Sequence, residues 1–187
     1  MEGLYGVLKL SENPPALYPE VGGIKDVRGT WWVAHARPRQ EKALAWDVLN
    51  SGGGYYLPMY EAVRRSARRS WKTMLLLFPG YVFLCGDADH RQRALESDRI
   101  AHAIPVPDQT ELVAELSAIR RVLVSKRGFD PYDSLAKSTA CRVRRGPLAG
   151  LNGRVVRRKN RTRFVLTVTI LGQGVAVEID ADMLEPC

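Results

Sequence analysis

Cysteine is scarce in this 187-residue sequence. Its three cysteines, Cys85, Cys141 and Cys187, lie far apart and form no CxxC pair. A disulfide framework or a cysteine zinc site needs an even set or closely spaced pairs, so the spacing argues against both and indicates reduced thiols.

Long hydrophobic runs are also missing. No stretch of about 18 apolar residues occurs, so we expect no membrane span. The first residues, "MEGLYGVLKLSENPP", have neither a basic leader nor a long apolar core, so we expect no secretory signal and place the protein in the cytoplasm.

Motifs for catalysis are missing as well. The three histidines, His35, His90 and His102, are scattered, and none has a second histidine at the helical spacing of a zinc site. The segment "SGGGYY" has neither the P-loop lysine nor the Rossmann spacing, and no serine or cysteine lies in a nucleophile motif. We therefore expect no enzyme, no cofactor and no metal.

Basic residues, in contrast, are abundant. Lys and Arg number 28 against 20 Asp and Glu, a formal net charge of +8 that favours a polyanionic partner. One basic group lies in "RRSARRSWK", at the tip of a predicted hairpin, where it is either a solvated loop or a contact to nucleic-acid phosphates. This predicted nucleic-acid contact consists of Arg64, Arg65, Arg68, Arg69 and Lys72. A second group, residues 154–163, surrounds a later turn, where solubility explains the charge better than nucleic-acid contact does, because Phe164 is the only aromatic residue nearby that could stack on a base.

Hydrophobic periodicity predicts an α+β chain. Residues 30–37, 55–63, 71–84 and 101–106 read as strands. Helices are expected in "RQEKALAWDVLN", which the glycines after Asn50 end, over 89–98, and from a capping box at Asp108 to near Val124. Short β-branched runs after Cys141 predict a small antiparallel barrel. The predicted parts are an irregular, flexible extension (1–28), a first domain (29–125), a linker (126–139) and the barrel (140–187).

The run "LLLFPGYVFL" is unusual because Pro79-Gly80 stands at its centre. Proline cannot donate to a sheet ladder and glycine has no side chain to pack, so a regular core strand avoids both. We expect the break to bend the strand and to place Phe78, Tyr81 and Phe83 in an aromatic patch partly outside the core.

Together these motifs resemble a known family. "WWVAHARPRQEKALA", "YLPMY" and "LFPGYVFL", followed by "VRRGPLAGLNGRV" and "ILGQGVAVEID", are similar to the NusG family of bacterial transcription elongation factors, over roughly residues 30–187. The resemblance implies an NGN domain, with a four-stranded antiparallel sheet flanked by helices, and a small all-β KOW barrel of the SH3-like type. The extension and the tri-glycine turn lie outside the family's usual pattern.

The resemblance also implies partners and site residues. In this family the NGN domain docks on the clamp helices of the largest RNA polymerase subunit, and the KOW domain recruits proteins such as Rho or a small-subunit ribosomal protein. The matching polymerase-binding positions are His35, Phe78, Pro79, Tyr81 and Phe83. The matching KOW contacts are Leu148, Leu151, Ile170, Leu171 and Gly172, although these aliphatic residues also fit a barrel core.

The resemblance thus implies a monomeric elongation factor that suppresses pausing or termination, and the basic groups add an expected non-specific contact to nucleic-acid backbone. Leu171 takes a place often held by an aromatic residue in the family, which favours a specialised member over the housekeeping factor. A second interpretation is a ribosome-associated or general RNA-binding KOW protein, which would bind structured RNA without polymerase. A nucleic-acid-modifying enzyme would need a catalytic constellation that the sequence lacks.

Overall fold

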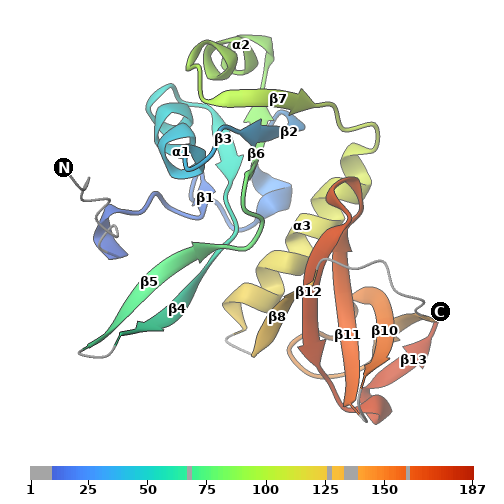
Figure 1. The fold of residues 1–187 in the computed structure, drawn as a ribbon. Coiled ribbons are helices and arrows are strands. Elements are labelled where there is room, and N and C mark those ends of the chain that lie inside the picture. The colour runs from blue at the N-terminus through green and yellow to red at the C-terminus, as the bar shows by residue number, and fades with distance from the viewer. Residues whose placement is uncertain (1–9, 67–68, 126–127, 133–138, 159–160) are drawn as a thin grey trace. The chain divides into compact units, whose positions relative to one another are not determined.

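The computed structural model describes residues 10–66, 69–125, 128–132, 139–158 and 161–187 (Figure 1). Its contacts divide the chain into two compact units, Met1–Pro105 and Val106–Cys187. Both helices and antiparallel sheets are present, so the predicted α+β class is confirmed. Within the described residues, no helix is long and apolar enough to cross a membrane.

The first unit is built on a five-stranded antiparallel sheet (Figure 1). Four of its strands make up the predicted four-stranded sheet, and the N-terminal segment adds a fifth at the edge. In spatial order the strands are β1 (Leu17–Tyr18), β3 (Gly54–Tyr56), β6 (Tyr81–Gly86), β2 (Thr30–Ala36) and β7 (Ile100–Ile104).

Two helices, α1 (Glu41–Asn50) and α2 (Ala88–Glu96), cover one face of this sheet. Their apolar side chains form one core with alternate residues of the strands, because side chains that point to the same face recur every second residue. This core includes Trp32, Ala34, Leu44, Val48, Val82, Leu84 and Ala94. The opposite face of the sheet carries other buried side chains, among them Val33, Tyr56 and Phe83.

A separate two-stranded hairpin, β4 (Met59–Arg65) and β5 (Ser70–Leu76), extends away from the sheet (Figure 1). The two runs predicted as single strands, 55–63 and 71–84, are each divided between the sheet and this hairpin. The divisions fall at Pro58 and Pro79, which have no N–H to continue a ladder. At the base of the hairpin, Leu77 N donates a hydrogen bond of 2.9 Å to the Pro58 carbonyl, so the two points at which the runs are divided lie side by side.

The N-terminal segment forms short regular elements from Leu10 onward. Besides β1 it forms two short 3-10 helices, η1 (Leu10–Glu12) and η2 (Ile24–Asp26). Leu17 is 7% exposed and Ile24 only 1%. The expectation of a flexible extension is therefore wrong for residues 10–28, because isolated apolar residues without a period do not reveal from the sequence what will bury them.

The second unit contains α3 (Gln109–Val124) and a six-stranded antiparallel sheet (Figure 1). The predicted cap is confirmed, because the Asp108 carboxylate accepts a hydrogen bond of 2.8 Å from Glu111 N. In spatial order the strands are β13 (Leu184–Pro186), β9 (Thr139–Val143), β10 (Asn152–Arg158), β11 (Arg161–Val168), β12 (Gln173–Glu178) and β8 (Phe129–Tyr132).

Two features of this unit differ from the sequence reading. Strand β8 lies inside the segment expected to be a linker and pairs with β12, and α3 groups with the barrel strands. The proposed domain boundaries thus stay predictions. The barrel itself is tightly built: a Cβ at Gly174 would overlap the Leu166 carbonyl oxygen, and Phe164 is fully buried.

Candidate functional site

The Pro79-Gly80 pair forms the corner at which the chain leaves the hairpin and enters the sheet. Gly80 has φ +86°, a value that glycine adopts without steric strain. The Tyr81 N–H donates to the Phe78 carbonyl over 3.1 Å and closes the turn. The position of Pro79-Gly80 at the centre of an apolar run is thus explained, because the pair separates β5 and β6, which belong to different sheets.

The backbone of this corner is held on both sides. The Gly80 carbonyl accepts a hydrogen bond of 2.8 Å from Ala36 N, at the end of β2. The Gly80 N–H donates over 2.8 Å to the Glu41 carboxylate, which lies in the first turn of α1 and is only 7% exposed. A carboxylate at a helix N-terminus is favourably placed, so Glu41 ties the corner to α1.

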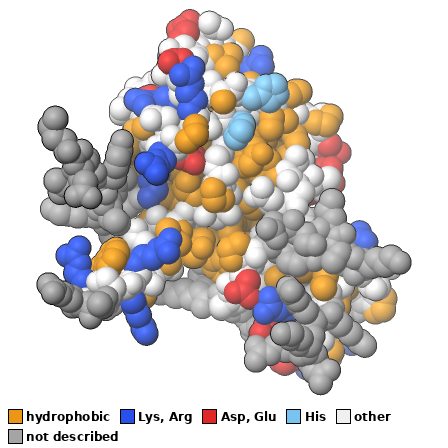
Figure 2. All heavy atoms as spheres, in the orientation of Figure 1, with side chains coloured by type: hydrophobic (Ala, Val, Ile, Leu, Met, Phe, Trp, Pro, Cys, Tyr) orange, Lys and Arg blue, Asp and Glu red, His pale blue; other side chains and the backbone are white. Residues whose placement is uncertain are grey.

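Three ring side chains form a row across the adjacent strands β6, β2 and β7, beside this corner. Tyr81 and His102 both pair in register with His35, and cross-strand partners point to the same face. The rings of His35 and Tyr81 stack with centroids 5.0 Å apart and 24° between their planes. His35 and His102 are exposed and Tyr81 is half-buried. Histidine side chains lie next to hydrophobic surface on the face drawn in Figure 2.

The expected aromatic patch needs correction at two positions. Phe78 is 1% exposed and Phe83 is 0% exposed, and the two rings pack edge to face with centroids 5.9 Å apart. Both belong to the core. Phe83 lies opposite the buried Val33 on β2, and Phe78 packs against Phe83. The accessible members of the predicted set are His35, Tyr81 and the exposed Pro79. His102 was missed, since only the register between β2 and β7 brings it beside His35.

The hairpin carries the predicted basic group. Four of its members are exposed, namely Arg64, Arg65, Arg69 and Lys72, while Arg68 lies outside the described residues. Lysine and arginine side chains gather over the hairpin in Figure 2, around hydrophobic atoms. The Lys72 ammonium pairs with the Glu61 carboxylate at 2.8 Å, so part of this charge is compensated.

An aromatic residue lies among these cations. The Arg69 guanidinium carbon is 5.2 Å from the centroid of the Trp71 ring, within the range of a cation–π contact. Trp71 also pairs across the strands with Arg64. The sequence analysis considered only the basic residues of this hairpin. Strand alternation would also have placed Trp71 on the same side as Arg69, two residues earlier.

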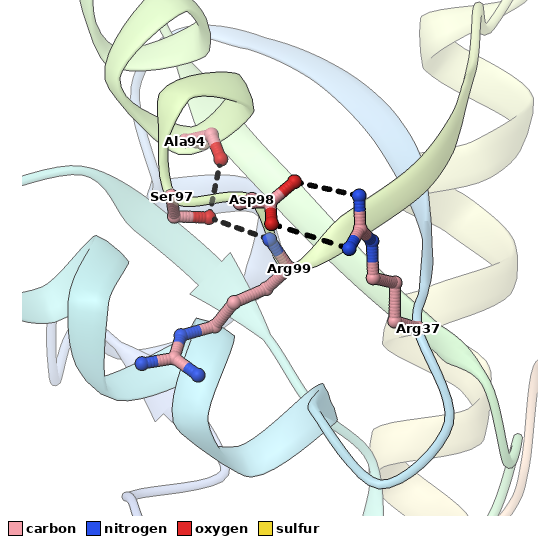
Figure 3. A network of polar contacts seen from close by, with 5 residues as sticks. All are labelled: Arg37, Ala94, Ser97, Asp98 and Arg99. Atoms are coloured by element: carbon pink, nitrogen blue, oxygen red, sulfur yellow. Dashed lines mark hydrogen bonds and ion pairs between the residues drawn. The ribbon is translucent and has the colours of Figure 1, made fainter.

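A polar network joins the end of β2 to the turn between α2 and β7 (Figure 3). The Arg37 guanidinium donates to the Asp98 carboxylate at 2.6 and 3.2 Å, and Arg99 N donates to Ser97 Oγ at 3.4 Å. The Arg99 side chain in turn reaches Asp47 at 2.5 Å. Arg37 and Arg99 line a surface depression, and both are already paired within the chain. Such exposed pairs add little stability individually. Because their charges are compensated, we do not interpret the network as an anion site.

The predicted contact residues of the barrel are partly internal. Leu148 is 2% exposed and belongs to the core, so its assignment as a surface contact needs correction. Leu151, Ile170 and Leu171 are half-buried, and Gly172, at φ +63°, ends the 3-10 helix η3 (Thr169–Leu171). The edge around η3 is thus the accessible part of the predicted set.

Helix α3 contacts the barrel next to that edge. The Glu115 carboxylate accepts hydrogen bonds from the Thr169 N–H, at 3.0 and 3.1 Å, and from the Thr169 hydroxyl. Burial raises the pKa of Glu115 from its ordinary value, while the bonds from Thr169 act in the opposite direction. One turn and a half further along, Arg121 donates to the carbonyls of Pro147 and Ala149 at 3.0 and 3.1 Å.

One buried thiol and one member of the second basic group are unavailable to a ligand. Burial raises the pKa of the Cys85 thiol to about 12, so it stays protonated and unreactive. In the second basic group, Arg163 pairs with Asp130 at 2.9 Å. Throughout the described part of the chain, no three His, Cys, Asp or Glu side chains come together in a way that would hold a metal ion.

Two comparisons with known proteins found a match. The family model described as "Transcription termination factor nusG" matches residues 29–129. A solved structure titled "Domain interaction in Thermotoga maritima NusG" is 15% identical, with a TM-score of 0.45, and the match covers 88% of this chain and 99% of that one. No curated protein sequence matches the chain.

Proposed function

Because this chain belongs to the NusG family of transcription factors, we propose that it binds elongating RNA polymerase through the clamp helices of the largest subunit. Binding favours the closed, elongating state of the enzyme and suppresses pausing and termination without any catalytic step. A ligand shifts such an equilibrium only by binding one state more tightly than the other.

The observation that carries this proposal is the row of rings beside Pro79, formed by the exposed His35 and His102 and the half-buried Tyr81. Aromatic side chains on a rigid sheet provide contact area at low entropy cost, as protein interfaces require. The row lies within the residues that match the family model. The Glu41–Gly80 hydrogen bond supports it further, because it holds the corner in one conformation before a partner arrives.

The barrel is proposed to act as a tethered recruiter. A partner such as Rho or a small-subunit ribosomal protein would bind at the edge around η3, through Leu151, Ile170 and Leu171. Tethering raises the effective concentration of that partner beside the polymerase. The basic hairpin would contact nucleic-acid phosphates in the same complex, and the protein would act as a monomer in the cytoplasm.

The test is binding to core RNA polymerase. We expect His35→Ala/Tyr81→Ala to weaken binding by about 10-fold or more, because truncated aromatic anchors in an interface cost roughly 1–4 kcal/mol. The control is Trp46→Ala/Leu95→Ala, which removes exposed apolar side chains from α1 and α2 on the other face of the sheet. Circular dichroism checks that both variants fold.

The outcomes separate the two interpretations of the sequence. Binding that is lost in the His35/Tyr81 variant and kept in the control supports the polymerase interface. If the wild type ignores polymerase but binds structured RNA in a strongly salt-dependent way, a ribosome-associated or general RNA-binding role replaces it.

A further inference from the structure

The two faces of the β4–β5 hairpin differ in charge and in aromatic content. Arg64 and Trp71 are cross-strand partners and therefore share one face. Arg69 lies two residues before Trp71 and places its guanidinium over the same ring. On the other face Val63 is paired with Lys72, whose charge is compensated by Glu61.

The first of these faces combines exposed arginines with a half-buried indole. Within the described part of the hairpin, the Lys72–Glu61 contact is the only ion pair found, so Arg64 and Arg69 keep their charge available for a ligand. The Trp71 indole N–H is buried and has no acceptor among the described residues. With its N–H buried, the accessible part of the half-buried Trp71 side chain is ring carbon, which can stack but cannot donate a hydrogen bond.

These chemical groups match an unpaired nucleotide better than a base pair in a duplex. A duplex hides the faces of its bases in the stack, so it would use only the arginines. A single strand offers phosphates to the arginines and, in addition, a free base that can stack on an aromatic ring. Arginine planes also stack on bases, so Arg69 can remain beside a base that takes its place over the indole.

We propose that this Arg64–Trp71–Arg69 face binds single-stranded nucleic acid, with one unpaired base on Trp71 and its flanking phosphates on the two arginines. The inference rests on the proposed function for its setting, since an elongating polymerase exposes single-stranded DNA and single-stranded RNA. Single-stranded DNA and single-stranded RNA both offer the phosphates and the free bases that this face would bind.

The experiment measures affinity of the full chain by fluorescence anisotropy, without polymerase. The probes are labelled single-stranded DNA and single-stranded RNA of about 12 nucleotides, within the usual site size of such proteins, and the matching DNA duplex. The variants are Trp71→Leu, Trp71→Phe and Arg64→Gln/Arg69→Gln. Trp46→Leu is the matched control, because Trp46 is an exposed tryptophan on α1.

We expect Trp71→Leu to weaken single-strand binding about 5- to 150-fold, the effect of losing one stacked base, and to leave the salt dependence unchanged. Trp71→Phe should retain most of the affinity. Arg64→Gln/Arg69→Gln should reduce the slope of log K against log[salt] by about 1.4, since each phosphate contact to a single strand contributes roughly 0.7. Trp46→Leu should bind as the wild type does.

The proposal is overturned if folded Trp71→Leu keeps its single-strand affinity within about twofold of the wild type, where a lost stack should cost at least about fivefold. Equal weakening toward the duplex also overturns it. A preference for the DNA or the RNA probe supports it and identifies the strand. Because the His35/Tyr81 variant is tested on polymerase and Trp71→Leu on oligonucleotides, failure of the polymerase proposal is distinguishable from failure of this one.

Discussion

At the scale of single residues, the local environment decides roles that residue type leaves open. Phe83 and Tyr81 are both aromatic and lie two positions apart, yet Phe83 is fully buried and Tyr81 reaches the surface. Glu115 and Glu41 are both carboxylates on helices, but one accepts from the barrel and the other from the Gly80 corner. In each case the hydrogen-bond partner or the neighbouring strand makes the difference.

Glu115 leads to a prediction about pH. Because its pKa in the folded protein lies above the ordinary value of 4.5, the folded state binds more protons than the unfolded state between these two values. Its stabilising contribution is therefore present below about pH 4.5 and is lost as the pH rises through the folded pKa. Glu115→Gln removes this titration.

The measurement is urea denaturation of wild type and Glu115→Gln at several pH values from about 4 to about 7. We expect the free energy of unfolding of the wild type, relative to the variant, to fall across this window. A difference that stays constant with pH would show that Glu115 titrates normally.

At the scale of elements, the N-terminal segment braces the hairpin. The Ala16 carbonyl accepts a hydrogen bond of 2.7 Å from Leu57 N, and the Tyr55 hydroxyl donates to the Pro15 carbonyl at 2.9 Å. Helix η1 contacts β5 directly. On the other side, the Lys42 ammonium donates to the Met74 carbonyl at 3.0 Å, and burial lowers the pKa of Lys42. The base of the hairpin is thus held from two directions.

Deletion of residues 1–15 should loosen the hairpin without unfolding the sheet, because β1 and its pairing with β3 are retained. We expect faster amide hydrogen exchange in β4 and β5, with exchange in β2 and β6 unchanged. Trypsin should also cleave faster after the exposed Arg64 and Arg65. Equal exchange in the hairpin of the deletion variant and of the wild type would exclude a bracing role.

At the scale of the whole molecule, the chain consists of two compact units, each with buried side chains of its own. In the second unit the barrel depends on close backbone approach at Gly174, where an added Cβ has no room beside Leu166. Because this contact lies inside the second unit, we expect a substitution at Gly174 to change the stability of that unit alone.

We therefore predict that Gly174→Ala unfolds the barrel and leaves the first unit intact. Backbone overlap of this kind cannot be relieved by a rotamer change, so the loss should be several kcal/mol, roughly 3 or more. Calorimetry should show the transition of the first unit at its wild-type temperature, while the barrel transition shifts down or disappears. Loss of both transitions together would show that the units fold as one.

Much of the fold follows from local signals. Helix α3 and its Asp108 cap, helix α1 with the glycine turn after it, and the β-branched runs of the barrel were all predicted within a few residues. Helix periodicity, capping and turn residues depend on near neighbours in the chain, so they can be read without the fold.

The candidate sites were predicted less completely. The basic residues of the hairpin and the position of Tyr81 follow from the sequence. The burial of Phe78, Phe83 and Leu148 does not, because burial depends on what packs against a residue from elsewhere in the chain. His102 gained its candidate role only from its cross-strand neighbour His35, whereas strand alternation alone would have placed Trp71 beside Arg69.

By itself, the sequence determined the α+β class, the order of the elements, the family and the basic charge of one hairpin. Only the tertiary structure decided that the Pro79-Gly80 pair separates two sheets, that residues 10–28 brace the hairpin, and that His35, Tyr81 and His102 form one row. The physical reason is that strand register and burial are set by contacts between distant segments, and those contacts exist only once the chain has folded.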